Sequence, residues 1–325
     1  MKTKLKTLLY PFTIMGSLLV LLTGCPEEPN ADPPALTTAE VIGITSNWAI
    51  SGGNITNDGG ADITERGVCW STTNPPSISD QTAKSGAGTG EFTCNFKGLT
   101  GNTTYYLSAY ASNKDATGYG DVISFTTPPT VTDVDGNEYA TVVIGTQTWM
   151  AENLKVIHYS NGDPIIYIAE GDSWGETEEG EFSDFDLIGK LDESYGFFYD
   201  GYAISDSRKI APEGWHVPTD EEWTTLIDYL GGTNVAAEKL RETGYIHWLR
   251  DAGTGQFPEG TNESGFTARA AGMYGDDHRL WEARFWTSTM VDENTIKWVG
   301  VDCTNLIIKG DTDLYGGMPI RLIKD

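Results

Sequence analysis

The sequence predicts a multidomain protein in which an all-β sandwich precedes an α+β domain. Its 325 residues suffice for two folded domains at the usual size of roughly 100–200 residues each. The run Thr-Thr-Pro-Pro-Thr at residues 126–130 is typical of a linker, and eight of the ten tryptophans follow it. Short β-prone segments come before this boundary, and the helix signals come after it. We therefore expect domains at residues 36–129 and 130–325.

Five segments of the first domain carry the β pattern, and turn residues separate them. They lie at residues 41–51, 64–71, 90–97, 104–112 and 121–127. Phe92, Cys94 and Phe96 alternate along one segment, so they share one face of a strand, which we expect to be the buried face. Several strands at regular spacing predict a two-sheet sandwich.

Residues 99–111 resemble the signature of the fibronectin type III family. In that family a Leu, a Thr and a Tyr precede an alternating strand, and here these are Leu99, Thr103 and Tyr105. Gly101 stands where the family usually has Pro. The resemblance implies a fibronectin type III-like sandwich for residues 36–129.

Three of the four cysteines, Cys69, Cys94 and Cys303, lie in the expected folded domains. An odd number argues against a scaffold held together by disulfides. Cys69 and Cys94 are candidates for one bridge across the sandwich. The alternative is two buried free thiols, because Cys packs as a small hydrophobe. We expect Cys303 to be a buried thiol.

The clearest helix signal follows Pro218. Thr219 is an N-cap residue and Glu222 follows three residues later, which is a capping box. An apolar stripe at helical spacing comes next, made of Trp223, Leu226, Ile227 and Leu230. Two glycines at 231–232 end the helix, and a second short helix is expected at about residues 235–242.

Four motifs of the second domain resemble the Fibrobacter succinogenes major paralogous domain. They lie, in order, at residues 149–154, 214–223, 262–266 and 285–289. The resemblance implies an α+β fold similar to the C-type lectins and the sulfatase-modifying factors, with one or two helices against small antiparallel sheets.

The chain departs from that family at two cysteine positions, which hold Ile210 and Leu322. Their joint replacement predicts an apolar contact where the family has a disulfide. The related sulfatase-modifying enzymes need reactive cysteines in this domain. Only Cys303 is present here, so we do not expect that activity.

The N-terminus has the pattern of an export signal. Three lysines precede an apolar run at residues 8–22, which is too short and interrupted for a typical membrane span. The sequence Leu-Thr-Gly-Cys that follows resembles the bacterial lipobox, which implies a signal peptide at residues 1–24 and an acylated Cys25. The alternative is an ordinary signal peptide with an incidental Cys. Residues 25–35 are acidic and Pro-rich, as expected of a tether.

The chain carries a formal net charge of −26, so we expect no nucleic-acid partner. The expected location is the outer membrane, through the lipid anchor. Two acidic residues just after Cys25, Glu27 and Glu28, resemble a surface-export signal, so the protein is expected to face outward.

No catalytic set is recognisable, so we expect neither an enzyme nor a bound cofactor or metal. Nucleophile-elbow, phosphate-loop and zinc motifs are absent, and the four histidines lie far apart. His216 lies within a family motif and is interpreted as structural. Residues 170–186 carry eight acids, which indicate a solvated loop or, alternatively, a cation site.

Three tryptophans in polar, loop-like contexts are the candidate ligand-binding residues: Trp174, Trp248 and Trp281. Exposed aromatic rings can stack on sugars, although partial burial under a loop is the alternative for each. The sequence thus favours a non-catalytic, lectin-like module for an extracellular glycan or protein. A structural envelope or adhesin component with a protein partner is the second hypothesis, and an enzyme of unknown type is the third.

Overall fold

The computed structural model describes residues 30–169, 173–186, 189–190, 195–245, 247–248, 257–274 and 280–325. The predicted signal peptide, residues 25–29 of the predicted tether and, among them, the predicted lipidation site Cys25 lie outside these residues. Within them, no helix is long and apolar enough to cross a membrane.

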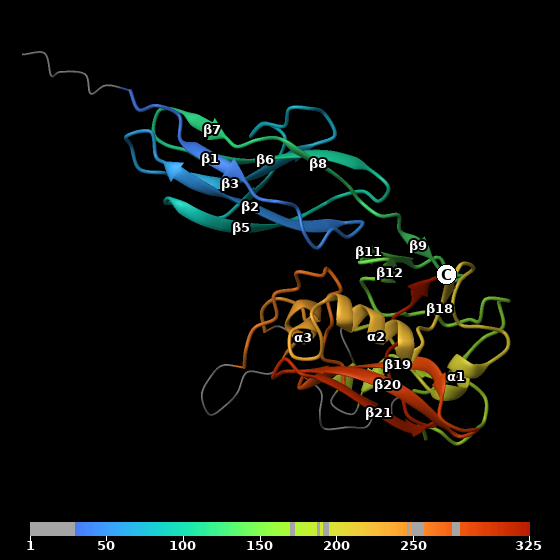
Figure 1. The fold of residues 1–325 in the computed structure, drawn as a ribbon. Helices are drawn as coiled ribbons and strands as arrows, with labels where there is room; N and C mark the ends of the chain where they lie inside the picture. Colours follow the sequence, from blue (N-terminus) through green and yellow to red (C-terminus); the bar gives the residue numbers. More distant parts are fainter. Residues whose placement is uncertain are drawn as a thin grey trace, which may run out of the picture. The chain divides into compact units, whose positions relative to one another are not determined.

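The first domain is a sandwich of two antiparallel sheets (Figure 1). One sheet has the order β1 (Ala35–Thr38), β2 (Trp48–Asn57), β5 (Gly90–Lys97). The other has the order β4 (Gln81–Lys84), β3 (Glu65–Ser71), β6 (Thr104–Ser112). Two short strands, β7 (Thr117–Tyr119) and β8 (Ile123–Thr126), pair with different parts of the free edge of β6. The predicted sandwich is confirmed.

The core of the sandwich follows the alternation in the sequence. Phe92, Cys94 and Phe96 of β5 are buried, whereas the residues between them are exposed. The Phe96 ring lies 4.8 Å from the ring of Trp70 in the opposite sheet. The Tyr105 hydroxyl accepts a hydrogen bond from the Thr100 amide at 3.0 Å, as in the tyrosine corner of such sandwiches.

The first expected strand, at residues 41–51, begins later than predicted, because β2 starts at Trp48. The Thr45 hydroxyl accepts the amide hydrogens of Asn47 at 3.3 Å and Trp48 at 2.9 Å. A Thr side chain that bonds to the following backbone makes a turn, so the chain reverses here instead of continuing as a strand.

The candidate bridge between Cys69 and Cys94 is not formed, and both are buried free thiols, as in the alternative. Val68 and Trp70 point into the sandwich core, so Cys69 between them points to the other face of its sheet, away from Cys94. The Cys69 thiol donates to the Ser108 carbonyl at 3.4 Å. Burial raises the pKa of both thiols, that of Cys69 to about 11.

The described residues of the second domain form small sheets and three short helices. One sheet has the order β11 (Thr141–Ile144), β12 (Gln147–Met150), β22 (Ile323–Lys324), β18 (Trp215–His216). A second is β19 (Glu282–Met290), β20 (Thr295–Asp302), β21 (Ile307–Asp313), and a third is β13 (Ile166–Tyr167), β14 (Glu181–Ser183), β17 (Phe198–Tyr199). Two-stranded pairs are β9 (Val131–Thr132) with β10 (Glu138–Tyr139), and β15 (Phe185–Asp186) with β16 (Gly189–Lys190). The likeness to C-type lectins and the domain boundaries stay predictions.

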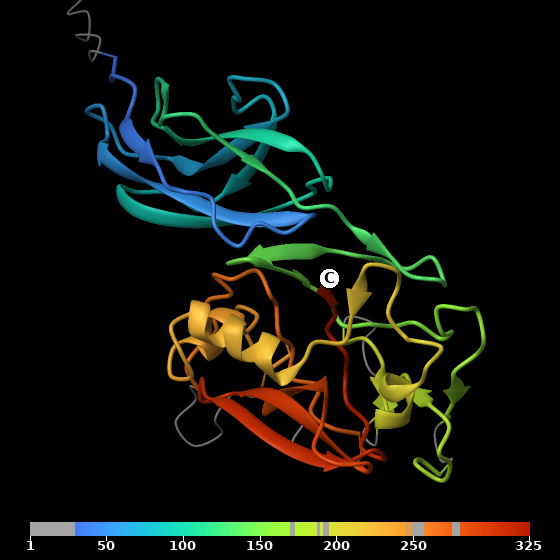
Figure 2. The same cartoon turned by 45° about the vertical axis from the view of Figure 1, so that its right-hand side comes forward.

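The predicted helix is confirmed as α2 (Asp220–Tyr229). Both hydrogen bonds of the capping box between Thr219 and Glu222 are present. The second expected helix is α3 (Ala236–Leu240), and both helices lie over one face of the β19–β21 sheet (Figures 1 and 2). Trp223 of α2 packs there against Trp149, with ring centroids 4.9 Å apart.

The C-terminal segment runs through the core, although only its end is a strand. Arg321 is fully buried, and its guanidinium donates to Asn153 Oδ1 at 2.7 and 2.9 Å and to the Met150 carbonyl at 3.2 Å. Burial lowers the pKa of Arg321 to about 9. Ile210 and Leu322 belong to the same buried apolar cluster, as expected if apolar packing replaces the family disulfide.

Candidate binding face

The structure separates the three candidate tryptophans. Trp174 is partly exposed and Trp281 is 44% exposed. Trp248 is only 2% exposed, so the expectation of an accessible ring is wrong there. Its Nε1 donates to the Ala268 carbonyl at 3.2 Å, and the Arg241 guanidinium lies over the ring at 4.2 Å. Trp248 is therefore a core residue.

The Trp174 ring is held in place from several sides. It stacks on Tyr274 with centroids 4.5 Å apart and an interplanar angle of 21°. Its Nε1 donates to the Tyr315 carbonyl at 2.7 Å. Gly317 makes the close approach possible, because a Cβ there would lie 2.6 Å from Cζ2 of the ring. The indole thus has its single donor satisfied within the protein while part of its surface reaches solvent.

Two further tyrosines continue this surface. Tyr315 is 40% exposed, and its ring lies 5.2 Å from that of Tyr202 at 62°. A hydrogen bond with Tyr315 raises the pKa of Tyr202 to about 12. We call the four residues from separate segments the aromatic face: Trp174, Tyr202, Tyr274 and Tyr315. Sequence reasoning found only Trp174, and the signal it missed was the Gly-Gly pair after Tyr315.

A buried carboxylate anchors the Trp174 segment. Glu181 is 1% exposed, and its carboxylate accepts the Gly175 amide hydrogen at 2.8 Å and the Thr177 hydroxyl at 3.2 Å. The expectation of a solvated acidic loop is therefore wrong for Glu181. It holds for Glu176, Glu178 and Glu179, which are exposed, whereas residues 170 and 172 lie outside the described residues.

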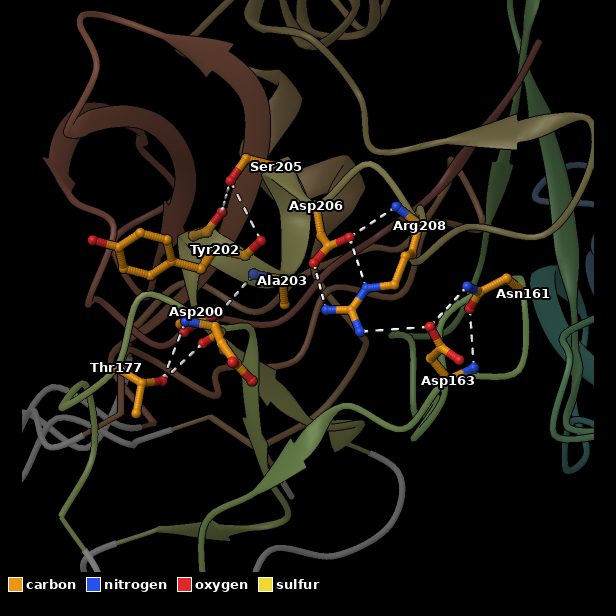
Figure 3. A network of polar contacts seen from close by, with 11 residues as sticks. Asn161, Asp163, Thr177, Asp200, Tyr202, Ala203, Ser205, Asp206 and Arg208 are labelled. Atoms are coloured by element: carbon orange, nitrogen blue, oxygen red, sulfur yellow. Dashed lines mark hydrogen bonds and ion pairs between the residues drawn. The ribbon is translucent and has the colours of Figure 1, made fainter.

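A second buried carboxylate supports the helix that carries Tyr202. Asp200 caps α1 (Gly201–Ser205), with Oδ1 accepting the Ala203 amide hydrogen at 2.8 Å (Figure 3). Its backbone amide donates to the Glu181 carbonyl at 3.2 Å. Within the described residues Asp200 Oδ2 has no hydrogen-bond partner. Burial, assisted by the nearby Glu181 charge, raises the pKa of Asp200 to about 7.

An ion pair between Asp206 and Arg208 lies directly after the C-terminal end of α1. Arg208 Nη2 lies 2.6 Å from Asp206 Oδ2, and the guanidinium stacks over the Tyr159 ring at 4.1 Å. Figure 3 shows Tyr202 pointing away from this pair. The short helix is thus held at both ends, which fixes the position of Tyr202.

Trp281 is not part of the aromatic face. Its nearest aromatic neighbour is Phe257, at 5.8 Å. Trp281 directly precedes β19, whose Glu282 pairs with Asp302, whereas the opposite end of β20, Thr295, pairs with Asp313 near Tyr315. Trp281 and the aromatic face therefore lie at opposite ends of this sheet.

In the described part of the chain no group of three or more His, Cys, Asp or Glu side chains could hold a metal ion. His216 Nδ1 lies 2.6 Å from Asp325 and its Nε2 lies 3.0 Å from Glu222, and these two carboxylates raise its pKa. His216 thus joins the C-terminus to the cap of α2, which agrees with its structural interpretation.

The fold and the aromatic face define a β-rich protein with a sandwich and a helix-containing domain that exposes fixed aromatic rings. The model of the Fibrobacter succinogenes major domain matches residues 142–324, more than half of the 325 residues. The chain therefore belongs to this family.

Comparison with solved structures gives partial likenesses. The sensor domain of the anti-sigma factor RsgI4 of Pseudobacteroides cellulosolvens is 13% identical over 30% of this chain and 76% of that chain, with a TM-score of 0.23. The sixth fibronectin type III domain of a human fibronectin type III domain containing protein 3 is 23% identical over 35% and 98%, with a TM-score of 0.22. The twitchin kinase region of C. elegans is 9% identical over 64% and 36%, with a TM-score of 0.22. No curated protein matches.

Proposed function

We propose that this chain is a lipid-anchored, non-catalytic protein of the cell envelope whose C-terminal domain binds an extracellular glycan through the aromatic face. The lipobox-like Cys25 and the acidic, Pro-rich tether support the anchored location. The observation that carries the binding function is Trp174, a partly exposed ring that its neighbours hold in one orientation.

The chemistry of the ring favours a sugar as ligand. The face of an aromatic ring is electron-rich, so it attracts the polarised C–H groups on the flat side of a pyranose. With Nε1 committed to the Tyr315 carbonyl, the accessible part of Trp174 offers mainly apolar surface. Because the ring is already ordered by Tyr274 and Gly317, binding costs little conformational entropy. The exposed Tyr315 next to it adds a hydroxyl that can bond to the sugar.

The test is glycan binding by the full chain, purified in detergent, on an array followed by calorimetry. Trp174→Ala should weaken binding roughly 5- to 150-fold, if the ring contributes the roughly 1–3 kcal/mol that aromatic rings contribute when nucleobases stack on them. Trp281→Ala is the matched control, since it removes an exposed tryptophan at the other end of the sheet, and it should bind as the wild type does. Near-UV circular dichroism of both variants checks that the fold persists.

Two outcomes would overturn the proposal. If the wild type binds no glycan on the array and captures another envelope protein instead, the structural or adhesin function is favoured. If Trp281→Ala abolishes binding and Trp174→Ala does not, the site is wrongly placed.

A further inference from the structure

Carboxylates surround the aromatic face. Glu176, Glu178 and Glu179 follow Trp174 within five residues and are all exposed. The Glu178 charge is close enough to Tyr202 to contribute to its raised pKa. Asp313 is exposed as well, and its Oδ1 accepts the Tyr315 amide hydrogen at 3.1 Å. The aromatic face therefore has acidic side chains close to Tyr202 and Tyr315, and three exposed glutamates follow Trp174 along the chain.

The described segments that build this face, 173–186, 195–206, 270–274 and 311–318, contain no Lys or Arg. The basic residues that flank them, Arg208 and Arg269, are held in ion pairs with Asp206 and Glu242. Glycan carboxylates and sulfates are normally bound by such cations, Arg in particular. Neutral hydroxyl groups, in contrast, can donate hydrogen bonds to the exposed carboxylates of Glu176, Glu178 and Glu179, which we call the rim. The net charge of −26 adds a repulsive field for any anion that approaches.

We propose that the aromatic face selects uncharged glycans and rejects those that carry uronate or sulfate groups. This inference rests on the proposed glycan-binding function and adds the charge class of the ligand. Three carboxylates at about 10 Å from a ligand anion would together weaken its binding by up to about tenfold in water at low salt.

The experiment uses pairs of hexasaccharides with the same linkage that differ by oxidation at C6: cellohexaose and its uronate, mannohexaose and its uronate, galactohexaose and its uronate. In each pair that binds, the neutral member should bind roughly tenfold more tightly at 20 mM salt. The gap should narrow in 1 M salt, where the Debye length is about 3 Å.

Removing the three rim charges separates their effect from that of the net charge of the protein. The triple variant Glu176→Gln, Glu178→Gln, Glu179→Gln should bind the uronates more tightly and narrow the gap within each pair, because it removes the charge that repels the anionic member. A matched triple on exposed acids elsewhere, Glu213→Gln, Asp228→Asn, Glu238→Gln, removes the same total charge and should preserve the gap.

The outcomes separate the two proposals. If no member of any pair binds, both the glycan-binding function and its charge class fail. If a uronate binds as well as its neutral partner, the charge class is overturned while glycan binding stands. Closure of the gap by both triple variants would attribute it to net charge and would also overturn the role of the rim.

Discussion

Asp200→Asn should remove a pH-dependent loss of stability from the C-terminal domain. Asp200 is fully buried beneath α1, and its Oδ2 has no partner among the described residues. The native state therefore holds this proton more tightly than the unfolded chain does. As the pH rises, the unfolded chain releases its proton first, so the wild type loses stability between about pH 4 and pH 7 and then levels off.

The size of this loss of stability follows from the pKa of Asp200 in the folded protein and in the unfolded chain. The pKa of Asp200 is about 7, against an ordinary value of 3.8. At 1.36 kcal/mol per tenfold change, this corresponds to about 4 kcal/mol in all, and to about 3 kcal/mol between pH 4.5 and pH 8. The amide of the variant leaves one buried donor without a partner, which costs about 1–3 kcal/mol at every pH. That constant cost cancels when the two pH values are compared.

The assay is urea unfolding at pH 4.5 and pH 8, followed by tryptophan fluorescence, which mainly reports the second domain. Relative to the wild type, Asp200→Asn should gain about 3 kcal/mol on going from pH 4.5 to pH 8. Asp228→Asn, an exposed acid on α2, is the control and should show no such gain. A penalty for Asp200→Asn that is equal at both pH values would refute a raised pKa and leave Asp200 as a helix cap only.

Three further predictions concern single contacts. Gly317→Ala should weaken ligand binding at least tenfold and cost about 1–3 kcal/mol of stability, because the new Cβ would lie 2.6 Å from the Trp174 ring and 2.7 Å from the Tyr274 Cβ and must displace them; calorimetry and urea unfolding measure the two effects, and an unchanged affinity would contradict the role of the ring. Thr219→Ala should cost about 1 kcal/mol in urea unfolding, because it breaks the capping box, whereas Thr225→Ala on the exposed side of α2 should cost less than half of that; equal losses would contradict the role of the cap. Cys25→Ala should move the protein from the membrane to the soluble fraction on cell fractionation, and retention in the membrane would count against the anchor.

Local patterns predicted the elements whose signals are local. The predicted strands at 90–97 and 104–112 are β5 and β6 with the same bounds. A half-buried strand has alternating apolar and polar residues, and this alternation can be seen in the sequence itself. The helix after Thr219 was predictable because its cap and its apolar stripe lie within twelve residues. The short strands β1, β4 and β7 carry too few residues for a periodic signal, and pairing with longer neighbours creates them.

The candidate site depended on contacts that local patterns do not contain. Trp174 is partly exposed and Trp248 is buried although both follow polar residues, because Arg241 and Ala268 cover the Trp248 ring. Glu181 is buried amid exposed acids, because β14 places it beneath the segment that it anchors. Such differences come from packing between distant segments, which composition and periodicity do not report.

The placement of the two sandwich thiols has a consequence for handling and for biogenesis. Cys69 and Cys94 belong to different sheets, and Cys69 faces away from the core that holds Cys94. Both sulfurs donate to backbone carbonyls, and burial keeps both protonated at neutral pH. The stability of the sandwich therefore does not depend on a disulfide between these two cysteines. It can fold in a reducing or an oxidising compartment, and adding a reductant should leave its unfolding curve where it was.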